Sequence, residues 1–269
     1  MIHRLLLTGA AGKLGRHLRL SLRPYAQQMR LSDIAPLDQA GPGEQVQPCQ
    51  LADKQAVDRL VQGCNAIVHM GGLATEYPLE EILEANIKGV LHIYEGARRH
   101  GVERVVFASS NHVVGFHRQD EVLGTDCVRR PDSYYGLSKS FGEDVAQFYW
   151  NRHGIQSASL RIGSAFPEPK DRRMLHTWLS YRDLTELIRC CLYAPTLGHT
   201  VVFGMSDNRD PWWDNAGAAH LGFKPQDSAE PYRTEREKTP ALDAADPARI
   251  YQGGAFVKMG PFDDRTPPS

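Results

Sequence analysis

The stretch Thr8-Gly9-Ala10-Ala11-Gly12-Lys13-Leu14-Gly15 follows the short apolar run Leu5-Leu6-Leu7 and precedes a segment of helical character, Arg16 to Leu22. A strand that turns through glycines directly into a helix suits a pyrophosphate, because N–H groups of the first helical turn can face the phosphates. In such a turn Gly9 permits the tight bend, Gly12 lets the backbone approach the phosphates, and Gly15 lets helix and strand pack closely. The spacing is G-x-x-G-x-x-G rather than the generic G-x-G-x-x-G, so the loop alone predicts a phosphate site and nothing narrower.

The composition indicates an ordinary globular protein of one large or two small domains. The 269 residues are 41% apolar and 23% charged, and the net charge of −1 gives no reason to expect nucleic acid as a partner. The five cysteines lack metal-ligand spacing, so we expect free or buried thiols and no metal site. The first strand begins within a few residues of the start, and no apolar run approaches the roughly 18 residues of a membrane span. We therefore expect a soluble, cytoplasmic protein without a signal peptide or a membrane partner.

Asp33 ends a second predicted strand, Met29 to Asp33, and lies 24 positions after Gly9. That offset is close to the roughly 20 residues at which an acidic side chain meets the adenosine ribose of a dinucleotide. A carboxylate there accepts hydrogen bonds from the ribose diol and repels a 2′-phosphate, which favours NAD over NADP. Lys13 and Arg16 keep NADP as an alternative, since either could pair with that phosphate, and Asp33 could also be a solvated loop acid.

Apolar strands alternate with helices along the first half of the chain. The predicted segments are the strand Val46 to Gln50, a helix from the N-cap Asp53 to Gln62, the strand Ala66 to Met70, a helix from Leu79 to His100 and the strand Arg104 to Ala108. Four β-α alternations with apolar strands predict an α/β fold with a doubly wound parallel sheet. In this fold ligands bind beyond the carboxyl ends of the strands, where Asp33, Gly71-Gly72 and Ser109-Ser110 all lie.

Tyr135 and Lys139 lie four residues apart in a helix predicted from Pro131 to about His153, so their side chains share one face. A free tyrosine, with a pKa near 10, is a poor base at neutral pH. A neighbouring ammonium and the positive ring of an oxidised nicotinamide would lower that pKa and favour the phenolate. Ser110 would then hold and orient the substrate oxygen. The alternative is an amphipathic helix in which the pair falls together by chance, and Ser110 at a strand end argues against it.

The glycine loop, Asn86-x-x-Gly89, Ser109-Ser110 and Tyr135-x-x-x-Lys139 together resemble the extended short-chain dehydrogenase/reductase family, which includes sugar-nucleotide epimerases and dehydratases. The resemblance covers roughly the first 165 residues and implies a Rossmann-type fold that binds NAD. It implies that Tyr135 is the acid/base catalyst, that Lys139 tunes it and binds the nicotinamide ribose, and that Ser110 orients the substrate. The expected cofactor-binding residues are Gly9, Gly12, Lys13, Leu14, Gly15, Asp33, Gln50, Leu51, Met70, Gly71, Gly72, Asn86, Ser109, Tyr135, Lys139 and Ile162.

A tighter resemblance, to the bacterial members of that family that oxidise free uronates, runs nearly the whole length of the chain. It rests on the segments Ala108-Ser-Ser-Asn-His112, Arg161-Ile-Gly-Ser164 with Pro167-Glu-Pro169, Arg173-Met-Leu175 with Thr177-Trp178, Trp212-Trp-Asp-Asn215 and Gln252-Gly-Gly-x-Phe256. The implied reaction is NAD-dependent oxidation at C1 of D-glucuronate or D-galacturonate to an aldarolactone, which opens to the aldaric acid, with Tyr135 as the general base. Gln50 departs from the pattern, since aspartate is expected there, and this puts one adenine contact in doubt.

A uronate carries a carboxylate, so its site needs a fixed cation, and arginine binds carboxylates in a two-pronged fork better than lysine does. We expect Arg173, in the loop after Ile162-Gly163-Ser164, to supply this cation, with Arg172 as the alternative; either could instead be a solvated loop charge. The expected substrate-binding residues are Ser110, Asn111, His112, Tyr135, Ser164 and Arg173. His112 is not needed as the base, because the Tyr135–Lys139 pair supplies one.

Residues 166–269 are expected to form a small substrate-binding portion packed on the NAD-binding domain of residues 1–165, with a frayed tail from Asp263 to Ser269. This portion is short for the family and leaves little protein to wrap a nucleotide diphosphate, which argues against a sugar-nucleotide epimerase. Two other functions stay open, namely another epimerase or reductase of the family and a non-catalytic NAD(P)-binding sensor. The family resemblance also implies a homo-oligomer. The sequence does not indicate the preferred uronate, its anomer or the ring size of the lactone.

Overall fold

The computed structural model describes residues 1–260, which are built around one sheet of seven parallel strands. The strands are β1 (Ile2–Thr8), β2 (Ala26–Ser32), β3 (Glu44–Val46), β4 (Ala66–His69), β5 (Arg104–Ser110), β6 (Gln156–Ile162) and β9 (His199–Gly204). They lie in the order β3-β2-β1-β4-β5-β6-β9, so the direction of winding reverses between β1 and β4. This order defines a Rossmann-type doubly wound α/β fold and confirms the predicted fold class.

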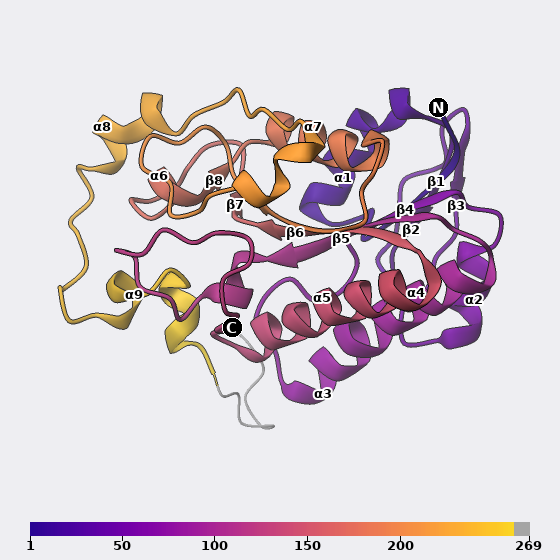
Figure 1. Ribbon diagram of the computed structural model, residues 1–269, viewed down its shortest axis with the longest axis horizontal. Helices are drawn as coiled ribbons and strands as arrows, with labels where there is room; N and C mark the ends of the chain where they lie inside the picture. Colours follow the sequence, from indigo (N-terminus) through magenta and orange to yellow (C-terminus); the bar gives the residue numbers. More distant parts are fainter. Residues whose placement is uncertain (261–269) are drawn as a thin grey trace.

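Helices cover both faces of the sheet (Figure 1). The longer ones are α1 (Lys13–Ser21), α2 (Lys54–Val61), α4 (Gly89–Arg99), α5 (Tyr134–His153) and α7 (Tyr181–Tyr193). Because successive side chains of a strand point to opposite faces, Leu5 and Leu7 of β1 join the core under α1 and α7, whereas Leu6 joins the core under α2, α4 and α5. All three leucines are fully buried. The apolar runs of the sequence therefore build two cores, one on each face of the sheet.

The bounds of the predicted strands differ from those in the structure, and two of the differences bear on the site. The strand predicted from Val46 to Gln50 lies earlier, since β3 pairs with β2 only over Glu44–Val46. Pro48 has no backbone N–H to donate, so a regular ladder cannot continue through it. The strand predicted to end at Ala108 continues to Ser110, so both serines of this segment belong to β5 itself.

The helix predicted from Leu79 to His100 is not a uniform α-helix. It consists of α3 (Leu79–Ile82), a π-helical turn (Leu83–Lys88) and α4, and Gly101 follows it with φ +68°. A π-helical turn widens the helix locally and often occurs at a functional position. Asn86 of the Asn86-x-x-Gly89 motif lies in this turn.

The second part of the chain contributes to the same sheet. Strand β9 pairs with β6, and α7 packs against α1. The shorter elements are β7 (Ser164–Ala165), β8 (Trp178–Leu179), α6 (Met174–Thr177), α8 (Arg233–Arg236), α9 (Pro247–Ile250) and 3₁₀ turns at Arg23–Tyr25, Asn111–Val114, Ala216–Leu221, Glu230–Tyr232 and Gly254–Lys258. The division of the chain at residue 165 stays a prediction, and the tail predicted to fray lies outside the described residues.

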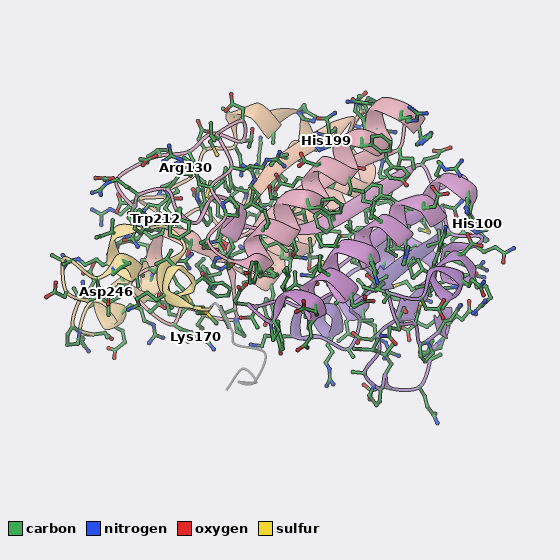
Figure 2. The ribbon with its side chains drawn as sticks, turned by 90° about the horizontal axis from the view of Figure 1, so that it is seen from below. His100, Arg130, Lys170, His199, Trp212 and Asp246 are labelled. Atoms are coloured by element: carbon green, nitrogen blue, oxygen red, sulfur yellow. The ribbon has the colours of Figure 1, made fainter. Side chains whose placement is uncertain are left out.

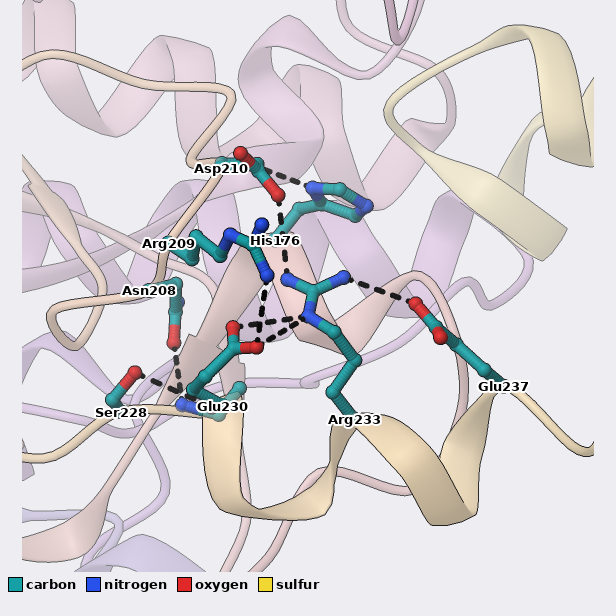
Figure 3. A network of polar contacts seen from close by, with 9 residues as sticks. His176, Asn208, Arg209, Asp210, Ser228, Glu230, Arg233 and Glu237 are labelled. Carbon is teal, nitrogen blue, oxygen red and sulfur yellow. Dashed lines mark hydrogen bonds and ion pairs between the residues drawn. The ribbon is translucent and has the colours of Figure 1, made fainter.

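A polar network fastens α8 to the loop that follows β9 (Figure 3). Arg233 donates Nε to both carboxylate oxygens of Glu230 (2.9 and 3.0 Å) and pairs with Asp210 and Glu237. The backbone carbonyl of Asp210 accepts from Nδ1 of His176 in α6 (2.6 Å). The network therefore ties α6 to α8 through side chains that are distant in sequence.

The two ends of the molecule differ in structure. Figure 2 shows Lys170, Trp212 and Asp246 together at one end, which loops and short helices form, and His100 at the other.

No helix within residues 1–260 is long and apolar enough to cross a membrane. All five cysteines are free, as predicted.

Candidate active site

One cavity of ≈ 1050 Å³ lies at the carboxyl ends of β1, β2, β4, β5 and β6 and extends to the segment at residues 253–256. Because parallel strands end at the same edge of a sheet, residues far apart in sequence meet there. The predicted site residues that line it are Gly9, Gly12, Lys13, Leu14, Gly15, Asp33, Gln50, Leu51, Met70, Gly71, Gly72, Ser109, Ser110, Asn111, His112, Tyr135, Lys139, Ile162, Ser164 and Arg173. Of the predicted set, Asn86 alone does not line this cavity.

The glycine loop has the close packing that its spacing predicts. Gly9 has φ +68°, and a Cβ at Gly15 would collide with the Gly9 carbonyl oxygen. Helix α1 begins at Lys13, its N-cap Gly12 contributes no side-chain cap, and its first turn holds no acidic residue. The N–H groups of this turn are therefore open to an anion at the positive end of the helix dipole. The loop thus fits the pyrophosphate of a dinucleotide.

Asp33 follows β2 and braces the glycine loop while it lines the cavity. Its Oδ2 accepts from the Ala11 N–H (2.9 Å) and its Oδ1 from the Ala35 N–H (3.0 Å). A 2′-phosphate here would meet a carboxylate, whereas a ribose diol could donate to it. Arg16, a cation that the NADP alternative would need, instead donates Nε to the Ala11 carbonyl (2.8 Å). The geometry at this end of the cavity therefore favours NAD.

Asn86 does not line the cavity, and its side chain is hydrogen-bonded within the protein. Its Oδ1 accepts from the Leu73 N–H (2.8 Å), and its Nδ2 donates to the Leu73 carbonyl (3.2 Å) and to Ser138 Oγ (2.9 Å). These bonds join the segment after Gly71-Gly72 to helix α5. Asn86 therefore supports the cavity wall from behind, and its predicted contact with the cofactor stays a prediction.

Tyr135, Lys139 and Ser110, the three predicted catalytic residues, form one cluster between α5 and the end of β5. They are 7%, 5% and 4% exposed, respectively. The Ser110 side chain accepts from the His112 N–H (3.2 Å) and lies near enough to the Tyr135 hydroxyl to act on its pKa. Lys139 Nζ donates to the Ala108 carbonyl (2.8 Å) and lies 5.6 Å from the centre of the Tyr135 ring. The cluster thus brings a phenol, a hydroxyl and an ammonium to one point of the cavity.

The electrostatics of this cluster differ from the prediction for tyrosine. Burial raises the pKa of Tyr135 to about 12, although the nearby Ser110 side chain opposes the shift. Burial also lowers the pKa of Lys139 to about 8. The charge of Asp132 raises the pKa of Tyr135 further, so in the protein alone the phenol stays protonated near neutral pH.

Arg173 reaches the cavity from the loop before α6, and neutral groups hold its guanidinium. Nε and Nη2 donate to the Gln252 backbone carbonyl (2.8 and 2.6 Å), and Nη1 donates to Ser164 Oγ (3.1 Å). With its amide oriented to satisfy both neighbours, Asn111 accepts from Nη2 (2.8 Å) and donates to the Ile162 carbonyl (3.0 Å). Within residues 1–260, every hydrogen-bond partner of Arg173 is uncharged.

Arg172, the alternative cation, lies outside the cavity. Its Nε donates to the Thr239 carbonyl (2.6 Å) and its Nη2 to the Glu237 carbonyl. Two adjacent arginines therefore point in different directions, one toward the cavity and one toward the segment after α8.

His112 lies on the cavity wall with its ring stacked on that of Phe256, the two centroids 3.6 Å apart. Its Nδ1 donates to Oδ2 of Asp132 at 2.7 Å. Burial lowers the pKa of the imidazole, and the nearby Arg173 charge lowers it further, whereas Asp132 raises it. The net shift is downward, so the ring is uncharged near pH 7.

Sequence reasoning gave no role to Glu76, Asp132 or Phe256, although all three contact predicted site residues. Glu76 is 2% exposed and accepts from the backbone N–H groups of Tyr134 (3.0 Å) and Tyr135 (2.7 Å). It thereby satisfies the first turn of the helix that carries Tyr135. Glu76 lies 58 positions before that helix, so no local pattern in the sequence links the two.

The glycine loop, the acidic residue after β2 and the Tyr-x-x-x-Lys pair on a shared cavity define a nucleotide-dependent enzyme of the short-chain type. The profile of the NAD dependent epimerase/dehydratase family matches residues 5–202. The chain belongs to this family.

Within the family, the chain is similar to uronate dehydrogenases over nearly its whole length. It is 60% identical to the uronate dehydrogenase of Pseudomonas syringae pv. tomato over 98% of this chain and 96% of that protein. It is 50% identical to the uronate dehydrogenase of Agrobacterium fabrum over 94% of this chain and 96% of that protein. A crystal structure of uronate dehydrogenase from Agrobacterium tumefaciens, a tyrosine-to-alanine mutant complexed with NAD, matches with a TM-score of 0.94 and 49% identity over 97% of this chain and 98% of that one.

Proposed function

We propose that this protein is a uronate dehydrogenase that uses NAD to oxidise D-glucuronate or D-galacturonate at C1. The product is an aldarolactone, which opens in water to the aldaric acid. Similarity to uronate dehydrogenases over 94–98% of the chain supports the reaction, and the match to a structure complexed with NAD supports the cofactor. The side chains that line the cavity support the roles below.

The observation that carries the proposal is the position of Arg173, which lines the cavity with only neutral partners in the described chain. Burial lowers the pKa of this guanidinium by more than the charges of Asp171 and Asp132 raise it, a sign that its charge lacks full compensation. A uronate carboxylate would supply the missing negative charge through a two-pronged contact. A neutral sugar would leave the charge uncompensated, so the same residue would select uronates against aldoses.

Tyr135 is the general base in this proposal. Its phenolate takes the proton of the C1 hydroxyl while Ser110 holds the same oxygen by a hydrogen bond, and the electrons of the broken O–H bond form the C1=O bond of the lactone. NAD, held by the glycine loop and Asp33, accepts the hydride from C1 and in its oxidised form adds the positive charge that Tyr135 needs. Lys139, with a pKa lowered to about 8, is still mostly protonated at pH 7 and can donate to the nicotinamide ribose.

The test is an initial-rate assay of NADH formation on D-glucuronate and D-galacturonate, with NAD and with NADP. D-Glucose and D-glucose 6-phosphate serve as the neutral and the phosphorylated control substrates. We expect turnover of the uronates with NAD and little with NADP or with glucose. A family epimerase would recycle its cofactor and give no net NADH, so the absence of NADH from both uronates would refute the proposed reaction.

The base is tested with Tyr135→Phe, which we expect to lower kcat by about 10²- to 10⁴-fold because general-base catalysis is lost. Binding of NAD, measured by calorimetry, should persist. Tyr134→Phe is the matched control on the neighbouring position and should keep wild-type turnover. Full turnover by Tyr135→Phe would show that Tyr135 is not the base. If the wild type binds NAD but turns over no sugar acid, a non-catalytic sensor would be favoured.

The proposal includes a homo-oligomer and a cytoplasmic location, both of which the family resemblance favours. Sedimentation velocity on the purified protein measures the first, and fractionation of the source cells measures the second. A monomer at enzyme concentrations used in the assay would remove the oligomer from the proposal without affecting the reaction.

A further inference from the structure

Asp132 lies in the loop before α5 with its side chain fully buried. Oδ2 accepts from His112 Nδ1 (2.7 Å), and Oδ1 accepts from the Ser133 hydroxyl (2.8 Å). Glycines surround this carboxylate, because a Cβ at Gly115 or Gly253 would collide with Oδ2. The carboxylate is therefore held in one place, between the catalytic helix and the C-terminal segment.

The ring of His112 is fixed on its other sides as well. It stacks on Phe256, with centroids 3.6 Å apart and planes 22° apart, and meets the Tyr135 ring edge-on at 5.9 Å. All three rings line the cavity. Nδ1 is engaged by Asp132, and no group within residues 1–260 is hydrogen-bonded to Nε2. The free ring nitrogen is therefore the one available to a bound molecule.

We propose that Asp132 is a positioning residue that fixes His112 as the Nδ1–H tautomer and so presents Nε2 as a hydrogen-bond acceptor for a hydroxyl of the uronate. An ionised carboxylate can only accept, so Nδ1 must carry the proton that joins the two groups. In an uncharged imidazole the other nitrogen then has a free lone pair. A sugar hydroxyl can donate to it, whereas a carboxylate cannot. This inference rests on the proposed function for the identity of the ligand.

The surrounding charges favour the uncharged ring. The charged and titratable groups that face His112 are Asp132 before α5, Tyr135 on α5, Arg173 before α6 and Glu76 after β4. Burial and the Arg173 charge lower the pKa of His112, and the two carboxylates raise it by less. Arg173 and His112 thus bind different groups of the substrate. The guanidinium of Arg173 binds the carboxylate, and the imidazole of His112 accepts a hydrogen bond from a ring hydroxyl.

The first test reads the tautomer directly in the free protein, by ¹⁵N NMR of the His112 ring near pH 7.5, assigned with His112→Gln. We expect Nε2 to give the signal of an unprotonated ring nitrogen and Nδ1 that of a protonated one. In Asp132→Asn, whose amide can either accept or donate, we expect a mixture of the two tautomers. A protonated Nε2 in the wild type would overturn the proposal, whatever the variant does and whether or not it folds.

The second test measures the consequence for the substrate in the NAD-saturated enzyme. Asp132→Asn should raise KM for the uronate about tenfold, the effect of losing one hydrogen bond to a buried partner, and change kcat much less. The Kd for NAD should be unchanged. Asp144→Asn, on the outer face of α5, is the matched control and should keep the wild-type KM. An Asp132→Asn enzyme with the wild-type KM would overturn the proposal.

A double-mutant cycle separates positioning from general support of the fold. In a His112→Gln background, Asp132→Asn should cause no further rise in KM, because Asp132 acts through the imidazole. Equal and additive effects of the two substitutions would overturn the proposal. An absence of uronate turnover in the wild type would instead refute the proposed function, and the NMR result would still decide the tautomer.

Discussion

Two arginines beside the active site, Arg161 and Arg173, have opposite electrostatic surroundings. Arg161 lies on β6 and donates Nη2 (2.9 Å) and Nε (3.0 Å) to the two carboxylate oxygens of Glu143 on α5, and both side chains are almost fully buried. Ser109 of β5 donates to the same carboxylate (2.7 Å). Arg173, by contrast, has a backbone carbonyl, a hydroxyl and an amide as partners.

The difference separates a charge that is paired within the fold from one that has no charged hydrogen-bond partner in the described chain and that we propose binds the substrate. A buried ion pair with satisfied hydrogen bonds needs no further partner. The Arg161–Glu143 pair, with Ser109, joins β5, β6 and α5. A guanidinium with only neutral partners keeps attraction for an anion, and its neighbours hold it in a fixed orientation before the anion arrives. The same residue type therefore stabilises the fold in one place and, in the proposed function, binds the substrate in the other.

Removing one partner of the structural pair should give the largest effect. Glu143→Gln leaves the Arg161 charge buried without a counter-charge, and we expect a loss of about 3–5 kcal/mol in the free energy of unfolding. Urea denaturation measures it. The double variant Arg161→Met/Glu143→Leu should regain most of the loss, because no charge is left buried. A loss below about 1 kcal/mol in Glu143→Gln would show that the pair is solvated like a surface pair.

Removing the charge of Arg173 should weaken substrate binding and leave the free energy of unfolding nearly unchanged. Arg173→Met should lower kcat/KM for uronates by about 100-fold or more, mainly through KM, because the substrate carboxylate loses its buried partner. The free energy of unfolding should change by less than about 1 kcal/mol, since lost hydrogen bonds and relieved desolvation oppose each other. Arg172→Met is the control and should retain uronate turnover. A stability loss as large as that of Glu143→Gln would erase the distinction between the two arginines.

Lys139 is a third buried cation, and its only hydrogen-bond partner in the described chain is the Ala108 carbonyl. Its folded pKa of about 8 lies below the unfolded value near 10.4, so the unfolded state binds more protons between these values and stability rises with pH there. Below pH 8 the free-energy cost of burying the charged Lys139 ammonium is fully present. Lys139→Met should therefore be more stable than the wild type by about 1–3 kcal/mol at pH 7.

The stability difference between Lys139→Met and the wild type should shrink as the pH rises from 7 to 9.5. Chemical denaturation at several pH values measures it. Tyr135, with a folded pKa of about 12, does not titrate in that window. A difference that stays constant with pH would contradict the lowered pKa of Lys139.

The smallest effect should come from the exposed pair Arg129–Asp144 on the outer face of α5 (2.7 Å). Both side chains keep much of their hydration, so Asp144→Asn should cost less than about 1 kcal/mol. Raising the salt concentration should reduce even this difference, because exposed charges are screened. The free energy of unfolding of the two proteins at low and high salt measures it, and a loss comparable to that of Glu143→Gln would mean that burial does not separate the two pairs.

Local motifs were sufficient to predict the sheet and the cofactor end of the cavity. The turn through Gly9 and Gly15 is a matter of backbone sterics within eight residues, and the alignment of Tyr135 with Lys139 follows from the helical repeat. Asp33 is placed by the end of its own strand. Each of these predictions needed only the conformation of one short segment.

Asn86 shows what a motif match leaves open. Its position in the chain was a motif match, but the direction of its side chain depends on a π-helical turn and on partners at Leu73 and Ser138. The strand predicted through Pro48 failed for a simpler reason, since the missing N–H was visible in the sequence.

The sequence by itself determined the fold class, the glycine loop and the alignment of Tyr135 with Lys139, because these depend on periodicity and on the spacing of a few residues along one element. It also led us to propose Arg173 as the cation, because the resemblance to enzymes that oxidise uronates implies a substrate with a carboxylate. Only the tertiary structure decided that Arg173 has neutral partners while Arg161 has Glu143. The charge state of a buried side chain is set by neighbours that arrive from other strands and helices, and no local pattern specifies which of two arginines receives the carboxylate.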